Sequence, residues 1–302
     1  MEILENKQGL TLEKAFEEFL VSRMATGVKD KTLKTYRLQA HAISKHTNPE
    51  ILLNAITKHD IDLMIVSMRK SGLKSTSIQT YTRLLRTFFN WSNAEGYTNI
   101  KIKLYHAEDT MKEPYTDEEL RRLLHEPEKD APFWEVRDWA IVNFLLNSGC
   151  RAATLRAIQI GDIDLEKNIV YFRHTKNGQG QVMPLCSHMQ SVLQRYLLIR
   201  QGNPRDPLFC SRRYKALSED SLKKAIVRYN HSRSVQKTSI HLFRHTFAKK
   251  YLLDGDGDAF TLQHLLGHKT IEMTKKYCNL YDADIVKRFE SICPLAILTS
   301  QK

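Results

Sequence analysis

Residues 11–96 carry the pattern that most constrains the fold, because apolar side chains recur there at steps of three and four. This spacing places the apolar side chains of each segment on one face of an α-helix. Thr11 precedes the first such segment and is a typical helix N-cap residue. Further helices are expected over 31–45, 58–70 and 75–94. The first third of the chain therefore predicts a bundle of α-helices.

Two of these helices combine an apolar face with a polar face that is rich in basic side chains. The faces belong to the segments 31–45 and 75–94. A basic helix face is typical of a DNA contact and equally typical of a solvated surface, so the pattern alone supports both interpretations evenly. The side chains that would contact DNA are Lys34, Arg37, Lys45, Gln79, Arg83 and Arg86.

A polar stretch over 97–114 separates this bundle from the rest of the chain and has no helical period. Thr116 then opens the sequence of a capping box, which is a signal for the start of a new helix. A fresh helix start after a polar linker indicates a domain boundary. We expect a helical domain over 1–108 and a second domain over 109–302.

The second domain predicts a mixed fold. An apolar helix over 132–147 is followed by Gly149, a typical helix C-cap. The segments 168–174 and 181–185 read as two strands of a hairpin, joined by a tight Asn-Gly turn. The expected class is mainly α with a small antiparallel β-sheet. Later helices are expected over 188–200, 218–230, 241–252, 258–266 and 270–281.

The composition favours a soluble protein that binds a polyanion. The 302 residues carry a net charge of +12, and nucleic acid is the commonest polyanion that such a basic protein meets. Residues 1–100 hold 14 basic and 10 acidic side chains, so the excess is not confined to one tail. The five cysteines lack CxxC spacing, which favours neither disulfides nor zinc. With no signal peptide and no apolar run of about 18 residues, a cytoplasmic protein without a membrane partner is expected.

Arg151 and Arg244 are suited to holding a phosphate. A guanidinium is planar, stays charged and can bind phosphate through two parallel hydrogen bonds. His241 lies three residues before Arg244, so both side chains leave one helical face and can reach one phosphate. The chain has no acidic cluster with metal-ligand spacing. The arginines would therefore stabilise the charge that develops on the phosphate, and we expect neither a metal nor a cofactor.

Tyr277 and Lys176 supply the other groups that a phosphoryl transfer needs. A tyrosine phenolate forms a phosphate ester that can be reversed. Lys176, at the mouth of the expected hairpin, can protonate the departing 5′-oxygen. His241 is placed to take the tyrosine proton, and His268 to hydrogen-bond the phosphate. Each residue alone is more typical of an ordinary surface, turn or core position. Their order along the chain indicates DNA cleavage through a phosphotyrosine ester.

This conjunction resembles the tyrosine recombinase family, also called the lambda integrase family. The similarity extends over nearly the whole chain, with 1–108 resembling the helical, SAM-like core-binding domain and 115–285 the α+β catalytic domain. The segments that carry it are 148–151 with 161–164 for the first arginine, 175–178 for the hairpin lysine, 241–248 for the HxxR box, and 265–268 with 274–277 for the second histidine and the nucleophile.

The resemblance implies a site-specific recombinase that clamps duplex DNA between its two domains. Tyr277 would hold the DNA 3′ end, and two rounds of exchange would pass through a Holliday junction in a homotetramer. The DNA would carry an inverted-repeat core site, and an accessory protein could set the direction. The apolar tail 283–302 would dock on a neighbouring subunit. The compact size resembles Xer-type proteins and integrases of mobile elements. The implied catalytic residues are Arg151, Lys176, His241, Arg244, His268 and Tyr277.

Two positions need comment. Family members commonly carry an acidic residue three positions after the first arginine, where this chain has Thr154. The supporting network of the active site therefore differs from the usual one. Tyr281 lies one helical turn after Tyr277 and is a rival nucleophile, but the spacing from His268 favours Tyr277.

Two alternatives share part of this pattern. A type IB topoisomerase uses the same chemistry as a monomer, and the helical bundle and the apolar tail argue against it. A non-catalytic DNA-binding protein could use the segment 258–268 as a helix-turn-helix. That class does not require Arg151, Lys176 or Tyr277.

Overall fold

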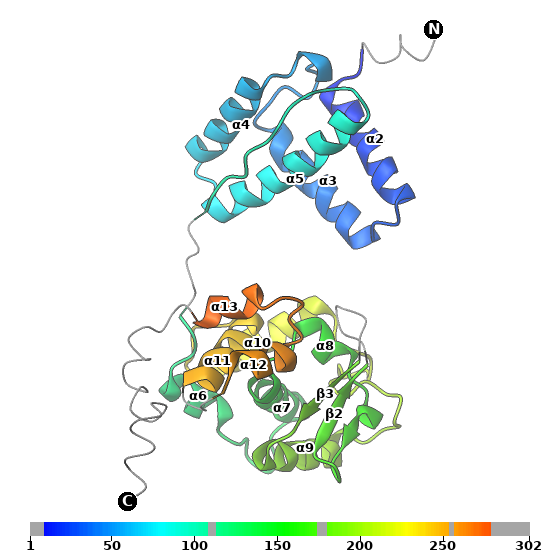
Figure 1. Cartoon of the computed structure of the whole chain (residues 1–302). Coiled ribbons are helices and arrows are strands. Elements are labelled where there is room, and N and C mark those ends of the chain that lie inside the picture. Colours follow the sequence, from blue (N-terminus) through cyan, green and yellow to red (C-terminus); the bar gives the residue numbers. More distant parts are fainter. Residues whose placement is uncertain (1–8, 108–112, 174–179, 254–256, 279–302) are drawn as a thin grey trace, which may run out of the picture. The chain divides into compact units, whose positions relative to one another are not determined.

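The computed structural model describes residues 9–107, 113–173, 180–253 and 257–278. The chain divides into two compact units, Met1–Met111 and Lys112–Lys302. Each unit has its own hydrophobic core. The described part is mostly helical with one three-stranded antiparallel sheet, which is the fold class expected from the sequence (Figure 1).

The described part of the first unit is a bundle of α-helices. Thr11 caps the first of them through a 3.3 Å hydrogen bond from the backbone N–H of Lys14. The last and longest helix packs against the other three, and its buried Phe88 stacks with Phe16 and meets Phe19 edge-on. All four predicted helices are confirmed. They are α2 (Leu12–Ala25), α3 (Asp30–Ser44), α4 (Lys58–Lys70) and α5 (Ser75–Ala94), with the 3-10 turn η1 (Leu53–Ala55) before α4.

The second unit is built around one buried helix, α7 (Phe133–Ser148). Four helices surround it, and every residue from Val136 to Leu145 is buried (Figure 1). The capping box that the sequence predicts is present, because Thr116 and Glu119 exchange both hydrogen bonds. The surrounding helices are α6 (Asp117–Leu124), α9 (Ser187–Arg200), α10 (Glu219–Ser232) and α11 (Ile240–Leu253).

A small sheet lies beside α7 and α9 (Figure 1). Val170 pairs with Met183 across its two longer strands, and both side chains are buried in the core. The predicted first strand starts one residue late because Asn168 adopts a positive φ of 57°. The predicted turn and Lys176 lie outside the described residues. The strands are β1 (Ile163–Asp164), preceded by the turn η2 (Ile160–Asp162), β2 (Ile169–Phe172) and β3 (Gln181–Pro184), in that order across the sheet.

Two short helices follow α11. They are α12 (Ala259–Leu266) and α13 (Glu272–Cys278), and they close a small cluster in which Leu252, Leu262 and Tyr277 are buried together. The expected helix over 270–281 therefore begins two residues late, and its last residues, with Tyr281 and the tail 283–302, lie outside the described part. None of the described helices combines the length and the apolar character that a membrane span requires.

Candidate active site

The turn at Gly149 brings the first predicted arginine to the site. Gly149 ends α7 in a left-handed conformation with φ 56°, and its N–H donates to the carbonyl of Leu145 at 2.9 Å. A Cβ atom at this position would lie 2.7 Å from Cδ1 of Phe247 and 2.8 Å from Cδ2 of Leu266. The end of α7 therefore touches α11 and the end of α12, which only glycine allows.

Arg151 follows this turn and is the N-cap residue of a six-residue helix, α8 (Ala152–Ala157). The sequence did not predict this helix. Arg156 fixes it to the loop before α10, because its Nε donates a 2.6 Å hydrogen bond to the carbonyl of Leu217. The side chain of Arg151 is half-buried, and its charge acts on Arg244, His268 and Tyr277.

Arg244 lies at the centre of the site and is 2% exposed. Its Nη1 donates to the carbonyl of Gly149 at 3.0 Å, and its Nη2 donates to the carbonyl of Leu266 at 2.8 Å. Burial and the charge of Arg151 lower its pKa to about 10, so the group remains a cation at neutral pH. A guanidinium has five N–H donors, and these two bonds leave others for Tyr277 and for a phosphate.

His268 follows α12 after Gly267, whose left-handed conformation redirects the chain. Its Nδ1 is 2.8 Å from Oγ1 of Thr274, which lies at the start of α13 and is fully buried. Burial, and the charges of Arg244 and Arg151, lower the pKa of His268 to about 4. The imidazole is therefore neutral at pH 7 and can donate a hydrogen bond to an anion.

Tyr277 lies in α13 and is 5% exposed. Its ring is nearly parallel to that of His268, with centroids 6.1 Å apart. Burial raises the pKa of the phenol, while the charge of Arg244, a hydrogen bond from it, and the charge of Arg151 act in the opposite direction. The phenol is thus protonated at neutral pH, and both arginines favour its ionised form.

Two histidines of α11 lie beside these groups. His241 is exposed, and its ring meets that of His245 at 82° with centroids 4.7 Å apart. The ring of His245 is in turn 5.4 Å from that of Tyr277. His241 is a site residue predicted from the sequence, whereas His245 was not predicted. Its position four residues after His241, on the same helical face, was the signal that could have identified it.

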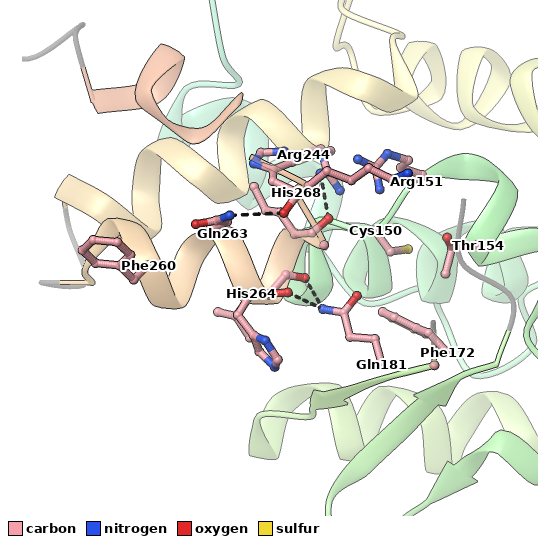
Figure 2. Close-up of a pocket in the computed structure, with 15 residues that line it drawn as sticks. Cys150, Arg151, Thr154, Phe172, Gln181, Arg244, Phe260, Gln263, His264 and His268 are labelled. Carbon is pink, nitrogen blue, oxygen red and sulfur yellow. Dashed lines mark hydrogen bonds between the residues drawn. The ribbon is translucent and has the colours of Figure 1, made fainter. Parts of the chain in front are cut away.

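A pocket of about 670 Å³ opens next to the arginines. Figure 2 shows Arg151, Arg244 and His268 gathered along one side of it. Thr154 also lines it and is 7% exposed, so a buried hydroxyl stands where a carboxylate is common in the family. The volume is within the range of ordinary ligand sites.

Gln181 forms another wall of this pocket and was also overlooked. Its Nε2 donates to the carbonyls of His264 and Leu265, at 2.7 and 2.8 Å (Figure 2). The first residue of β3 is thereby fixed to the carboxyl end of α12. Gly180 lines the pocket too and directly follows the undescribed segment 174–179 that contains Lys176.

No three His, Cys, Asp or Glu side chains in the described ranges are grouped as metal ligands. The predicted DNA contacts lie in the first unit, on the packed helices α3 and α5 and just after α3. Gln79 is half-buried, and the five basic side chains are exposed. Their role in DNA binding stays a prediction. The exposed residues are Lys34, Arg37, Lys45, Arg83 and Arg86.

Two family models match the chain and together cover most of it. Residues 114–284 match the phage integrase family, and residues 14–96 match the N-terminal SAM-like domain of phage integrases. The first match contains every candidate catalytic residue, and the second contains the helices α3 and α5.

Individual proteins agree with these models. The tyrosine recombinase XerC of Haemophilus ducreyi is 27% identical over an alignment of 296 positions, which covers 93% of this chain and 94% of XerC. A lambda integrase tetramer bound to a Holliday junction has a TM-score of 0.73 at 20% identity, over 92% of this chain and 80% of the integrase. The Tn1549 transposon integrase in complex with transposon right end DNA has a TM-score of 0.76 at 18% identity, over 94% of this chain and 99% of the integrase. The protein therefore belongs to the phage integrase family and is a site-specific tyrosine recombinase, an enzyme that breaks and rejoins DNA.

Proposed function

We propose that this recombinase cuts each strand through a 3′-phosphotyrosine bond at Tyr277, within an inverted-repeat core site of duplex DNA. The observation that carries the proposal is the position of Tyr277. Its side chain is buried, and its phenol is hydrogen-bonded to Arg244 and lies within the electrostatic influence of Arg151. Both arginines line the pocket. A phosphate bound by the arginines would lie next to the tyrosine oxygen.

The chemical roles follow from the charges of these groups. Arg151 and Arg244 stabilise the negative charge that develops on the non-bridging oxygens when the phenolic oxygen attacks phosphorus. His268 is neutral and donates a hydrogen bond to the same phosphate, and Thr274 fixes the orientation of its ring. We assign protonation of the departing 5′-oxygen to Lys176, on the sequence pattern alone.

Thr154 gives the phosphate clamp of Arg151 and Arg244 a neutral neighbour at the position where the family commonly has an acidic residue. A buried carboxylate next to Arg151 would offset part of the positive charge, whereas a threonine hydroxyl is neutral. The positive charge of the two arginines therefore acts on Tyr277 and on a bound phosphate without being offset by a carboxylate at position 154. This supports a clamp in which the guanidiniums alone set the affinity for the phosphate.

The active assembly that we propose is a homotetramer on DNA. Lambda integrase forms a tetramer on a Holliday junction, and this chain shares its fold. The tail 283–302, with Ile285, Phe289 and Ile292 among its apolar residues, would dock on the neighbouring subunit. We place the enzyme in the cytoplasm, as an Xer-type resolvase or the integrase of a mobile element, with an accessory protein where direction must be set.

A plasmid assay tests this function. Purified protein is incubated in EDTA with a supercoiled plasmid that carries two direct copies of the DNA flanking the gene. We expect two smaller circles and a Holliday-junction intermediate, and neither from Tyr277→Phe. A ladder of relaxed plasmids of unchanged size would indicate a topoisomerase instead. DNA binding without any cleaved product would indicate a non-catalytic DNA-binding protein.

A further inference from the structure

His245 occupies a position that the proposed mechanism has not used. It follows Arg244 directly in α11, and its ring contacts both His241, at 4.7 Å, and Tyr277, at 5.4 Å between centroids. On the same helical face, Ala248 is buried with Tyr277 in one apolar cluster. This face of α11 is therefore directed at the tyrosine.

Tyr277 needs a proton acceptor. Its burial raises the pKa of the phenol, so the nucleophile is protonated before it attacks. His268 is a weak base, because its pKa is about 4 and its Nδ1 is already paired with Thr274. His241 is exposed to solvent, and the half-buried His245 lies against it. The rings of Tyr277, His245 and His241 thus follow one another from the buried side chain to the exposed one.

We propose that His245 is a further catalytic residue, which accepts the phenolic proton of Tyr277 and shares it with His241. This inference rests on the proposed phosphotyrosine chemistry. It places His245 between Tyr277 and His241, the residue that the sequence suggests as acceptor of the tyrosine proton. The titratable and charged groups around the pair come from several elements: His241 and Arg244 from α11, His268 from the loop after α12, Arg151 from the start of α8, and Tyr277 from α13.

Atoms and charge balance in this step. The O–H bond of Tyr277 breaks, and the proton forms a new N–H bond on the imidazole of His245. The phenolic oxygen forms a bond to phosphorus as the bond from phosphorus to the 5′-oxygen breaks, and that oxygen takes the proton of Lys176. When the strands are rejoined, each transfer runs in reverse, so the imidazolium returns its proton to the departing tyrosine. The bound phosphate offsets the repulsion between the imidazolium and Arg244.

His245→Phe tests the proposal because a phenyl ring keeps the ring contacts but has no nitrogen. The first assay measures the rate of covalent adduct formation on a nicked duplex that traps the cleaved strand. We expect the variant to be slower by about 10²-fold or more, as for the loss of a general base. His125→Phe, at the exposed end of α6, is the matched control and should react like the wild type.

The second assay separates a base from a structural residue. In a Tyr277→Phe background, the protein joins a 5′-hydroxyl strand to a strand that ends in a 3′-(p-nitrophenyl) phosphate. The p-nitrophenolate leaves without needing a proton, so only the phosphate clamp and Lys176 are required. We expect His245→Phe to leave this joining rate unchanged.

Every outcome decides between the interpretations. Slow cleavage with normal joining supports the proton transfer by His245. Cleavage at the wild-type rate, or equal loss of cleavage and joining, overturns it, since the residue would then be dispensable or merely structural. Failure of the wild type itself to form an adduct would overturn the proposed function, and this inference with it.

Discussion

Arg244 donates a 2.8 Å hydrogen bond to the carbonyl of Leu266, the residue that lies two positions before His268. The same guanidinium donates to the carbonyl of Gly149, two positions before Arg151. One buried cation thus fixes the two chain segments that carry the other phosphate-binding candidates. The roles of Arg244 in folding and in catalysis are therefore linked. Arg151, in contrast, is only half-buried, and at the N-cap position of a short helix its side chain makes no capping hydrogen bond.

Replacing each of the two arginines should have a different effect on the free energy of unfolding. Arg151→Ala should keep the stability and DNA affinity of the wild type but form adduct about 10²–10³-fold more slowly, because one charged contact to the transition state is lost. Arg244→Ala should also lose about 2 kcal/mol or more of unfolding free energy, because two carbonyls lose their donor. Urea denaturation and adduct kinetics measure both. Wild-type stability in Arg244→Ala would contradict the assignment.

Gly149→Ala should destabilise the second unit by about 2–4 kcal/mol, since a left-handed conformation is strained for alanine and the new Cβ overlaps Phe247 and Leu266. Gly267→Ala is the matched control, because φ is 59° there and the new Cβ meets only the flexible end of Gln181, at 3.1 Å. Thermal unfolding of both variants gives the comparison. Equal losses would show that the close packing at Gly149 contributes nothing.

Gln181→Glu should weaken catalysis more than DNA binding. A carboxylate of the same shape cannot donate to the carbonyls of His264 and Leu265, and it adds a negative charge to the carboxyl end of α12. The segment that carries His268 and Tyr277 would then be less well fixed. We expect a lower maximal rate of adduct formation. The DNA concentration at which the rate is half-maximal should change little. Gln190→Glu, on α9, is a control of equal charge.

His268 should make stability depend on pH in a predictable direction. Its folded-state pKa of about 4 lies below the ordinary 6.5, so the unfolded chain binds the proton first as the pH falls. The stability linked to neutral His268 is therefore complete above about pH 6.5 and is lost as the pH falls towards 4. His268→Gln should lose less unfolding free energy than the wild type between neutral pH and about pH 5. Parallel curves for the two proteins would contradict the buried, neutral state.

Local signals in the sequence predicted most helices, because caps and periodicity are local properties. Helix α4 spans Lys58–Lys70, the range expected from the sequence, and Gly149 ends the central helix in the left-handed conformation that a C-cap requires. The six residues of α8 were missed, since fewer than two helical turns show no hydrophobic period. That helix is held by a contact with Leu217, 61 residues away from Arg156.

The candidate site was predictable as a set of residues but not as an arrangement. The order of Arg151, Arg244 and Tyr277 suggested phosphate chemistry before any distance was known. The contacts of Gln181 join residues 83 and 84 positions apart, and no local pattern announces them. His245 was overlooked because its importance lies in its contact with the ring of Tyr277. The chain brings that ring beside His245 only through the turn at Gly267.

The most direct test of the account is the covalent bond at Tyr277. Wild-type protein, Tyr277→Phe and Tyr281→Phe are incubated in EDTA with a nicked duplex built from the DNA that flanks the gene, and the products are separated under denaturing conditions. We predict a protein–DNA adduct that survives denaturation in the wild type and in Tyr281→Phe and is lost only in Tyr277→Phe. An adduct that persists in Tyr277→Phe, or that disappears from the wild type when EDTA is added, would contradict the account.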